Sequence, residues 1–134
     1  MAKPNLLVID DDKIYHFLVS RILDDVMAAE KFKSIFKFFS GSSALEHLTG
    51  NKSGEDNLIL LDLNMPGMSG FEFLEALDEY EEIHKHCTVY IVTSSVNESD
   101  RARADEFNIV KGYLVKPLKK SAIENLIAEE ASGE

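Results

Sequence analysis

The sequence contains little cysteine, glycine or proline. Its 134 residues include one cysteine, Cys87, together with seven glycines and three prolines. A single cysteine cannot form an internal disulfide, which agrees with a reducing compartment. So few glycines and prolines argue against a fibrous or low-complexity chain, and the 45% of hydrophobic residues is typical of an ordinary globular protein.

Positive charge and long apolar runs are also scarce. Lysine and arginine total 14 against 24 acidic residues, which gives a formal net charge of −10. This charge repels nucleic-acid phosphates and anionic membrane surfaces, so we expect neither nucleic acid nor a membrane as a partner. The first apolar run, Leu6 to Ile9, is much shorter than a signal-peptide core of about 7 to 15 residues or a membrane span of about 20. We therefore expect a cytoplasmic protein.

The length of the chain suits one domain that buries roughly two-thirds of its unfolded surface. We expect this single domain to span residues 1–134, with its core between residues 5 and 130. The last predicted helix lies near the end of the sequence, so we expect no effector domain.

Short apolar runs with turn signals at their ends are predicted to be β-strands. They do not alternate with polar residues, which indicates burial on both faces, as in a parallel sheet covered by helices. The predicted strands are Leu6 to Ile9, Ile35 to Phe39, Leu58 to Leu61, Val89 to Val92 and Tyr113 to Val115.

Helical stretches fall between and after the predicted strands. In the first, apolar residues recur at spacings of three and four and form one stripe: Ile14, Phe17, Leu18, Ile22 and Val26. Ser69 and Glu72 predict a capping box at the start of the third helix. The predicted helices are Lys13 to Ala29, Ser43 to Leu48, Gly70 to Tyr80, Ser99 to Phe107 and Lys119 to Glu130. Strands that alternate with helices indicate a doubly wound α/β fold with right-handed crossovers.

Polar side chains follow the predicted strands, where an open parallel sheet binds its ligands. Asp10 and Asp11 follow the first strand, Asp62 ends the third, Thr93 ends the fourth and Lys116 follows the fifth. Acidic side chains at one crevice repel each other by about 4 kcal/mol per pair at about 4 Å. A divalent cation relieves this repulsion, and oxygen donors favour Mg²⁺. A carboxylate beside Mg²⁺, a lysine and a hydroxyl could accept a phosphoryl group.

These motifs resemble the receiver domain of two-component response regulators, particularly the stand-alone, chemotaxis-type (CheY-like) kind. The resemblance runs from Leu6 to about Ile127, and the joint order of the motifs makes it specific. It rests on the segments Val8-Ile9-Asp10-Asp11, Leu61-Asp62-Leu63-Asn64-Met65-Pro66-Gly67-Met68-Ser69-Gly70, Val92-Thr93-Ser94 and Gly112-Tyr113-Leu114-Val115-Lys116-Pro117. It implies a flavodoxin-like fold of five βα units with strand order 2-1-3-4-5.

The resemblance also implies how phosphorylation occurs. Asp62 would accept a phosphoryl group from a phosphohistidine of a sensor histidine kinase or a histidine phosphotransfer protein, as in phosphorelay signal transduction. Asp10, Asp11, Asp62 and the main-chain carbonyl of Asn64 would bind Mg²⁺, one of the first two through water. Asp12 could equally cap the first helix, so it is left out of the site. We expect no enzymatic activity beyond self-catalysed phosphorylation and dephosphorylation.

Three further residues take roles by resemblance. Thr93 would donate a hydrogen bond to a phosphoryl oxygen, Lys116 would pair with its charge, and Tyr113 would be the aromatic switch residue. The Lys116–Pro117 peptide would be cis. The chain departs from the family in having Ser69 where aspartate is frequent, and its segment from Asp78 to Cys87 is a few residues longer than is typical.

Output is expected on the surface of the receiver itself. The predicted helix Ser99 to Phe107 has few large apolar residues and should be loosely held. We expect a downstream protein, or a second copy in a phosphorylation-dependent homodimer, to bind this helix, the Tyr113 strand and the last helix. Alternatives are a Mg²⁺-dependent aspartyl-phosphate phosphohydrolase, a pseudo-receiver that only binds partners and a flavin-binding module, although three acids after the first strand would repel a flavin phosphate.

Overall fold

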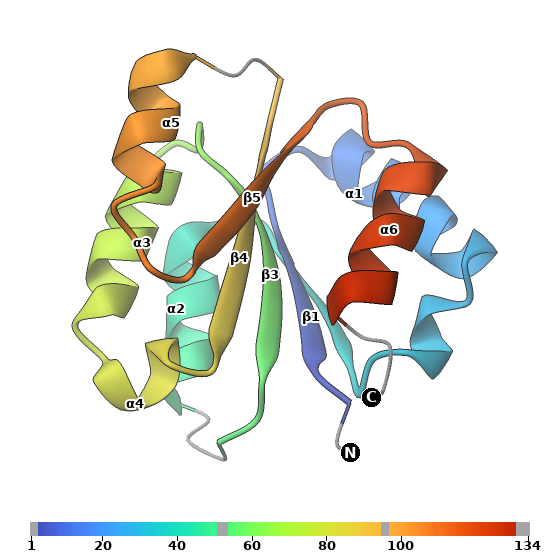
Figure 1. Cartoon of the computed structure of the whole chain (residues 1–134), viewed down its shortest axis with the longest axis horizontal. Helices are drawn as coiled ribbons and strands as arrows, with labels where there is room; N and C mark the ends of the chain where they lie inside the picture. The colour runs from blue at the N-terminus through green and yellow to red at the C-terminus, as the bar shows by residue number, and fades with distance from the viewer. Residues whose placement is uncertain (1–2, 51–53, 95–96, 131–134) are drawn as a thin grey trace.

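A five-stranded parallel sheet forms the centre of the protein (Figure 1). The structure is a computed structural model and describes residues 3–50, 54–94 and 97–130. The strand order is β2-β1-β3-β4-β5, which confirms the predicted flavodoxin-like α/β fold. The strands are β1 Asn5–Ile9, β2 Ile35–Phe38, β3 Asn57–Asp62, β4 Cys87–Thr93 and β5 Val110–Val115.

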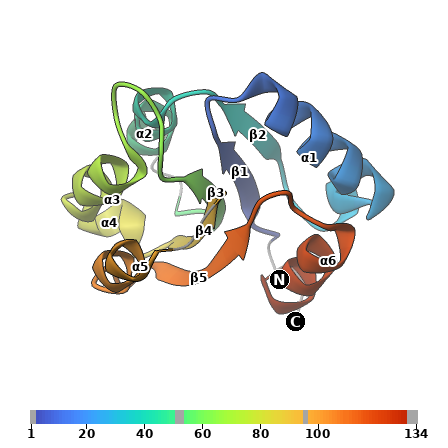
Figure 2. The same ribbon diagram turned by 90° about the horizontal axis from the view of Figure 1, so that it is seen from above.

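Helices cover both faces of the sheet (Figure 2). Helices α1 and α6 lie on one face, whereas α2, α3, α4 and α5 lie on the other. The helices are α1 Lys13–Asp25, α2 Gly41–Gly50, α3 Gly70–Asp78, α4 Glu81–His84, α5 Glu98–Ala104 and α6 Lys120–Glu130, with a 3₁₀ turn η1 at Ala28–Glu30. In the described part of the chain, no helix has both the length and the apolar character that a membrane crossing requires.

The sheet separates two apolar cores, and β1 shows why its sequence does not alternate. Leu7 and Ile9 pack into the core beneath α2 and α3. Leu6 and Val8 pack into the core beneath α1 and α6. All four are almost fully buried, so both faces of the strand require apolar residues.

Several helix boundaries differ from the prediction. Helix α1 ends at Asp25, because Met27 adopts a left-handed backbone conformation with φ of 56°. The longer segment after Asp78 contains α4, a one-turn helix that was not predicted. Helix α5 stops at Ala104, three residues before the predicted end. At α3 the predicted capping box is confirmed, since Ser69 and Glu72 exchange hydrogen bonds of 2.9 and 3.2 Å.

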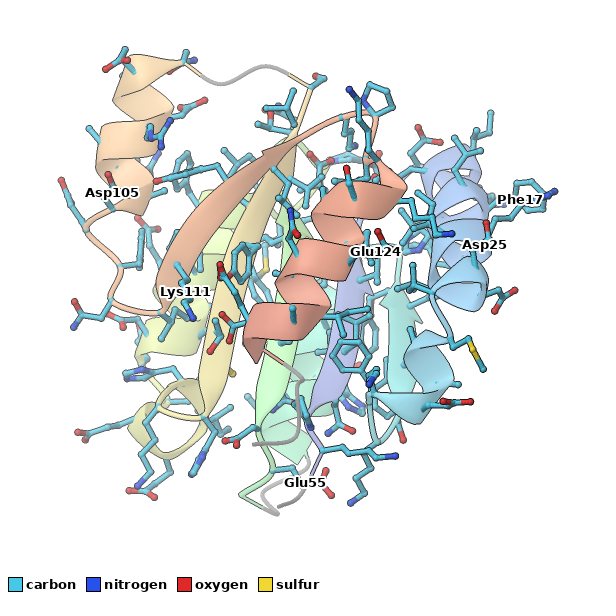
Figure 3. The ribbon with its side chains drawn as sticks, turned by 45° about the vertical axis from the view of Figure 1, so that its right-hand side comes forward. Phe17, Asp25, Glu55, Asp105, Lys111 and Glu124 are labelled. Atoms are coloured by element: carbon cyan, nitrogen blue, oxygen red, sulfur yellow. The ribbon has the colours of Figure 1, made fainter. Side chains whose placement is uncertain are left out.

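The stripe of apolar residues predicted along α1 is buried only in part, at Ile22 and Val26, which pack against the core beneath α1 and α6. Ile14, Phe17 and Leu18 are 70%, 60% and 51% exposed, and Figure 3 shows Phe17 on the outer side of the helix. The buried face contains Tyr15, His16, Val19 and Leu23 instead. Both faces of α1 carry apolar residues three and four positions apart, so periodicity alone could not select the inner one.

Candidate functional site

Four polar residues lie at the carboxyl end of the sheet. Asp62 is the last residue of β3, and Thr93 is the last of β4. Asp10 directly follows β1, and Lys116 directly follows β5. Because all neighbouring strands are parallel, their carboxyl ends share one edge of the sheet. The residues predicted from four strand ends are therefore brought together here.

An acidic cluster lies in the crevice at this edge. Asp10, Asp11 and Asp62 each offer a carboxylate oxygen, and these oxygens lie within 4.8 Å of one another. Asp10 and Asp62 are buried, whereas Asp11 is exposed. The crevice has a volume of about 680 Å³, and its donor set consists of carboxylate oxygens. Such a set suits a hard cation such as Mg²⁺, which prefers oxygen ligands and retains water on its open side.

Lys116 supplies positive charge to the same crevice. Its Nζ lies 2.7 Å from Oδ2 of Asp10 and 4.0 Å from Oδ2 of Asp62. Its backbone N–H donates to the carbonyl of Thr93 at 2.8 Å, which fixes the position from which the side chain extends. The peptide between Lys116 and Pro117 is cis, as the resemblance implied. Lys116 is thus paired mainly with Asp10.

The environment of Asp62 disfavours its negative charge. Burial and then the nearby charge of Asp10 raise the pKa of Asp62 from its ordinary value of 3.8 to about 6. Lys116 and the N–H of Asn64, which donates to Oδ1 of Asp62 at 3.4 Å, act in the opposite direction. A cation bound at the acidic cluster would add to these favourable contacts and hold Asp62 ionised. An ionised carboxylate is the form that can attack phosphorus.

The remaining predicted residues are Asn64, Thr93 and Tyr113. Asn64 is exposed and lines the crevice, whereas Thr93 is buried at the end of β4. Tyr113 lies on β5 with its side chain half-buried, and its hydroxyl donates to the carbonyl of Arg101 at 2.9 Å and to Asp105 at 2.6 Å. The aromatic residue of β5 is therefore tied to α5.

Two side chains of α1 contact residues of the site, although neither was predicted to do so. His16 is buried, and its Nε2 lies 2.7 Å from the carbonyl of Asp10 and 3.1 Å from that of Phe38. Both partners are carbonyl acceptors, so Nε2 donates, and the ring joins the end of β1 to the end of β2. The ring of Tyr15 lies beneath Lys116. Sequence reasoning missed both contacts because it placed a different face of α1 inward.

Asp12 begins α1 rather than joining the acidic cluster. Its side chain accepts a hydrogen bond of 2.9 Å from the N–H of Ile14, and its own N–H donates to Oδ1 of Asp10 at 2.9 Å. The first bond caps the helix, and the second orients a carboxylate of the cluster. The capping alternative left open by the sequence is therefore the one observed.

Comparison with known proteins agrees with this geometry. The chain is 29% identical over 118 residues to the chemotaxis protein CheY-3 of Vibrio cholerae, covering 88% of this chain and 84% of that protein. It is 28% identical over 115 residues to the cyclic di-GMP phosphodiesterase response regulator RpfG of Xanthomonas campestris, but spans only 28% of its length. A two-component response regulator from Legionella pneumophila superposes with a TM-score of 0.81 at 27% identity, covering 97% of this chain and 99% of that one. The model of the response regulator receiver domain matches residues 6–128, and the chain therefore belongs to that family.

Proposed function

We propose that this protein is a phosphorylation-activated switch of two-component signalling, with Asp62 as the phosphoacceptor. The observation that carries the proposal is the position of Asp62, a buried carboxylate beside Asp10 and Asp11 and 4.0 Å from the ammonium of Lys116. The donor would be a phosphohistidine of a sensor histidine kinase or a histidine phosphotransfer protein. The single cysteine agrees with a cytoplasmic location.

In the proposed transfer, an Oδ atom of Asp62 attacks the phosphorus of the phosphohistidine. The bond from phosphorus to the imidazole nitrogen breaks, its electron pair stays on that nitrogen, and an acyl phosphate forms on Asp62. Asp10, Asp11, Asp62 and the carbonyl of Asn64 would hold Mg²⁺, which neutralises charge on the phosphoryl oxygens when it is bound.

Two strand-end residues would then contact the transferred group. Lys116 already lies in the crevice and would move from Asp10 toward the phosphoryl charge on Asp62. Thr93, at the end of the adjacent strand, would donate its hydroxyl to a phosphoryl oxygen. Both contacts exist only in the phosphorylated state, so they provide the differential interaction that a population shift requires.

The exposed apolar face of α1 is suited to receive the phosphodonor. Ile14 lines the acidic crevice and also a neighbouring apolar groove that includes Leu18. Phe17 extends this exposed surface along the helix. A histidine-bearing domain that covers these side chains would place its phosphohistidine over Asp62, because the same helix turn borders both surfaces.

Output is proposed to occur at α5, β5 and α6. Among the residues of α5, Ala104 is buried and the others are more accessible. The helix is held in part by the hydroxyl of Tyr113, which contacts Arg101 and Asp105. If Thr93 moves toward the phosphoryl group, Tyr113 can occupy the space behind it and release α5. A downstream protein or a second copy of the chain would bind the changed face.

The direct test is the intact mass after incubation with acetyl phosphate, with and without Mg²⁺. Wild-type protein should gain one phosphoryl group only with Mg²⁺, and Asp62→Asn should gain none. Asp24→Asn, which changes an exposed carboxylate of α1, is the matched control and should be labelled like the wild type. Full labelling of Asp62→Asn would refute the assignment, and an unlabelled wild type would instead favour a pseudo-receiver.

A further inference from the structure

Tyr15 lies directly against the lysine of the proposed phosphoacceptor site. It is in the first turn of α1, is 7% exposed and packs into the core beneath α1 and α6. Nζ of Lys116 lies 4.5 Å from the centroid of its ring. This separation falls within the range of a cation–π contact, in which an ammonium is attracted to the negative face of an aromatic ring.

The ring face, rather than the hydroxyl, makes this contact. Within the described part of the chain, the buried Tyr15 hydroxyl has no hydrogen-bond partner. Burial, followed by the charges of Asp10 and Asp62, raises the pKa of this phenol above its ordinary value. Tyr15 is therefore neutral at physiological pH, and it attracts Lys116 through its π-system without forming an ion pair.

Lys116 needs a partner that a cation bound at the acidic cluster does not remove. In the resting structure its closest partner is Asp10, at 2.7 Å, and Asp10 also belongs to the acidic cluster. A cation bound by that cluster competes with Lys116 for the carboxylate. The Tyr15 ring binds no cation of the cluster, so it stays available to the ammonium. Without it, the flexible four-carbon chain of Lys116 would be free to extend into solvent.

We propose that Tyr15 is a positioning residue, whose ring holds the Lys116 ammonium at the crevice so that it meets the phosphoryl group on Asp62. This inference rests on the proposed function of Asp62. The contact confines the lysine side chain before phosphorylation. It thereby lowers the conformational entropy that this side chain loses when it binds the phosphoryl group. The substitution Tyr15→Phe keeps the ring face, whereas Tyr15→Leu fills the core with an apolar side chain that has no π-system.

The first measurement concerns the unphosphorylated protein. The ring current of Tyr15 should shift the side-chain methylene resonances of Lys116 upfield in the NMR spectra of the wild type and of Tyr15→Phe. In Tyr15→Leu these resonances should return to ordinary lysine positions. Identical Lys116 resonances in all three proteins would overturn the proposal, whatever the protein does with phosphate.

The second measurement is the affinity for beryllofluoride, a phosphoryl mimic, in the presence of Mg²⁺. Tyr15→Leu should weaken it about two- to fivefold, which corresponds to the energy of a cation–π contact, and Tyr15→Phe should match the wild type. In a Lys116→Met background, Tyr15→Leu should have no further effect, because Tyr15 acts through the ammonium. Val19→Ala, on the same buried face of α1, is the control for destabilisation alone and should bind like the wild type.

The outcomes separate this inference from the function on which it rests. Unchanged affinity in Tyr15→Leu, or a loss that persists in the Lys116→Met background, overturns the role of Tyr15. An equal loss in Tyr15→Phe also overturns it, because the hydroxyl would then be responsible. Failure of the wild type to bind beryllofluoride would overturn the proposed function itself.

Discussion

The raised pKa of Asp62 predicts that the proposed phosphoacceptor lowers the stability of its own fold at neutral pH. Between pH values of about 4 and about 6, the folded protein keeps a proton on Asp62 that the unfolded chain has lost. The unfolding free energy therefore falls as the pH rises through this interval. The variant Asp62→Asn has no titrating group at this position, so it should lack that component of the pH dependence.

The size of the effect follows from the pKa. A rise from 3.8 to about 6, at about 1.4 kcal/mol for each pKa unit, corresponds to about 3 kcal/mol. Asp62 is buried but borders the open crevice, so solvent screens part of this cost and about 3 kcal/mol is an upper bound. Asp62→Asn should match the wild type near pH 4 and exceed its stability by up to about 3 kcal/mol above pH 7.

The assay is urea unfolding of both proteins at a series of pH values with a chelator present. The quantity of interest is the difference in unfolding free energy between variant and wild type. Asp24→Asn should show a difference that is small and independent of pH, because Asp24 is exposed. Added Mg²⁺ should reduce the difference in unfolding free energy between Asp62→Asn and the wild type, because a cation stabilises the ionised carboxylate of the wild type. A difference that stays constant from about pH 4 to about pH 8 would refute the reasoning.

Three further predictions concern the metal, the lysine and Gly70, the first residue of α3. Mg²⁺ should raise the Tm of the wild type in a thermal melt, because its binding adds about 2.7 kcal/mol to the unfolding free energy at one hundred times its Kd. Asp11→Asn should abolish most of this shift in Tm. Equal shifts in the two proteins would exclude Asp11 as a ligand. Lys116→Ala should still be labelled by acetyl phosphate but should lose phosphorylation-dependent partner binding. Lys116→Arg should restore this binding only in part, because a planar guanidinium does not occupy the position of a compact ammonium. Full restoration by arginine would show that charge alone suffices. Gly70→Ala should destabilise the protein by about 1 to 3 kcal/mol in urea unfolding, since a Cβ there would lie 2.7 Å from the carbonyl oxygen of Asp62. The control Gly50→Ala, where a Cβ has no neighbour within 4 Å, should be neutral or stabilising, and equal effects at the two glycines would contradict the predicted clash.

The sequence alone determined the strands of the sheet and the residues at its carboxyl edge. Strands such as β1 and β3 are buried on both faces, so each required an uninterrupted apolar run that local sequence reveals. Because parallel strands end at the same edge, placing Asp10, Asp62, Thr93 and Lys116 at the carboxyl ends of four different strands also predicted that they would lie together. The order of the strands came from resemblance, because spacing in the chain does not fix which strands are neighbours.

Only the tertiary structure decided which face of α1 is buried. Ile14, Phe17 and Leu18 repeat with the period of a helix, but so do Tyr15, Val19 and Leu23. The packing of the helix against the sheet selects one face, and that choice turns Tyr15 toward Lys116 and leaves Phe17 exposed. Periodicity measures how apolar residues are spaced along a helix, whereas the direction of each face depends on distant parts of the chain.

The pKa of Asp62 was likewise decided by the tertiary structure. Its rise comes first from burial and then from Asp10, which follows another strand, and it is partly offset by Lys116, which follows a third. Desolvation and charge interactions depend on distances through space. The sequence therefore identified the carboxylate as a candidate site, whereas its protonation, its nearest cation and the ring beneath that cation follow from how the strands and α1 pack together.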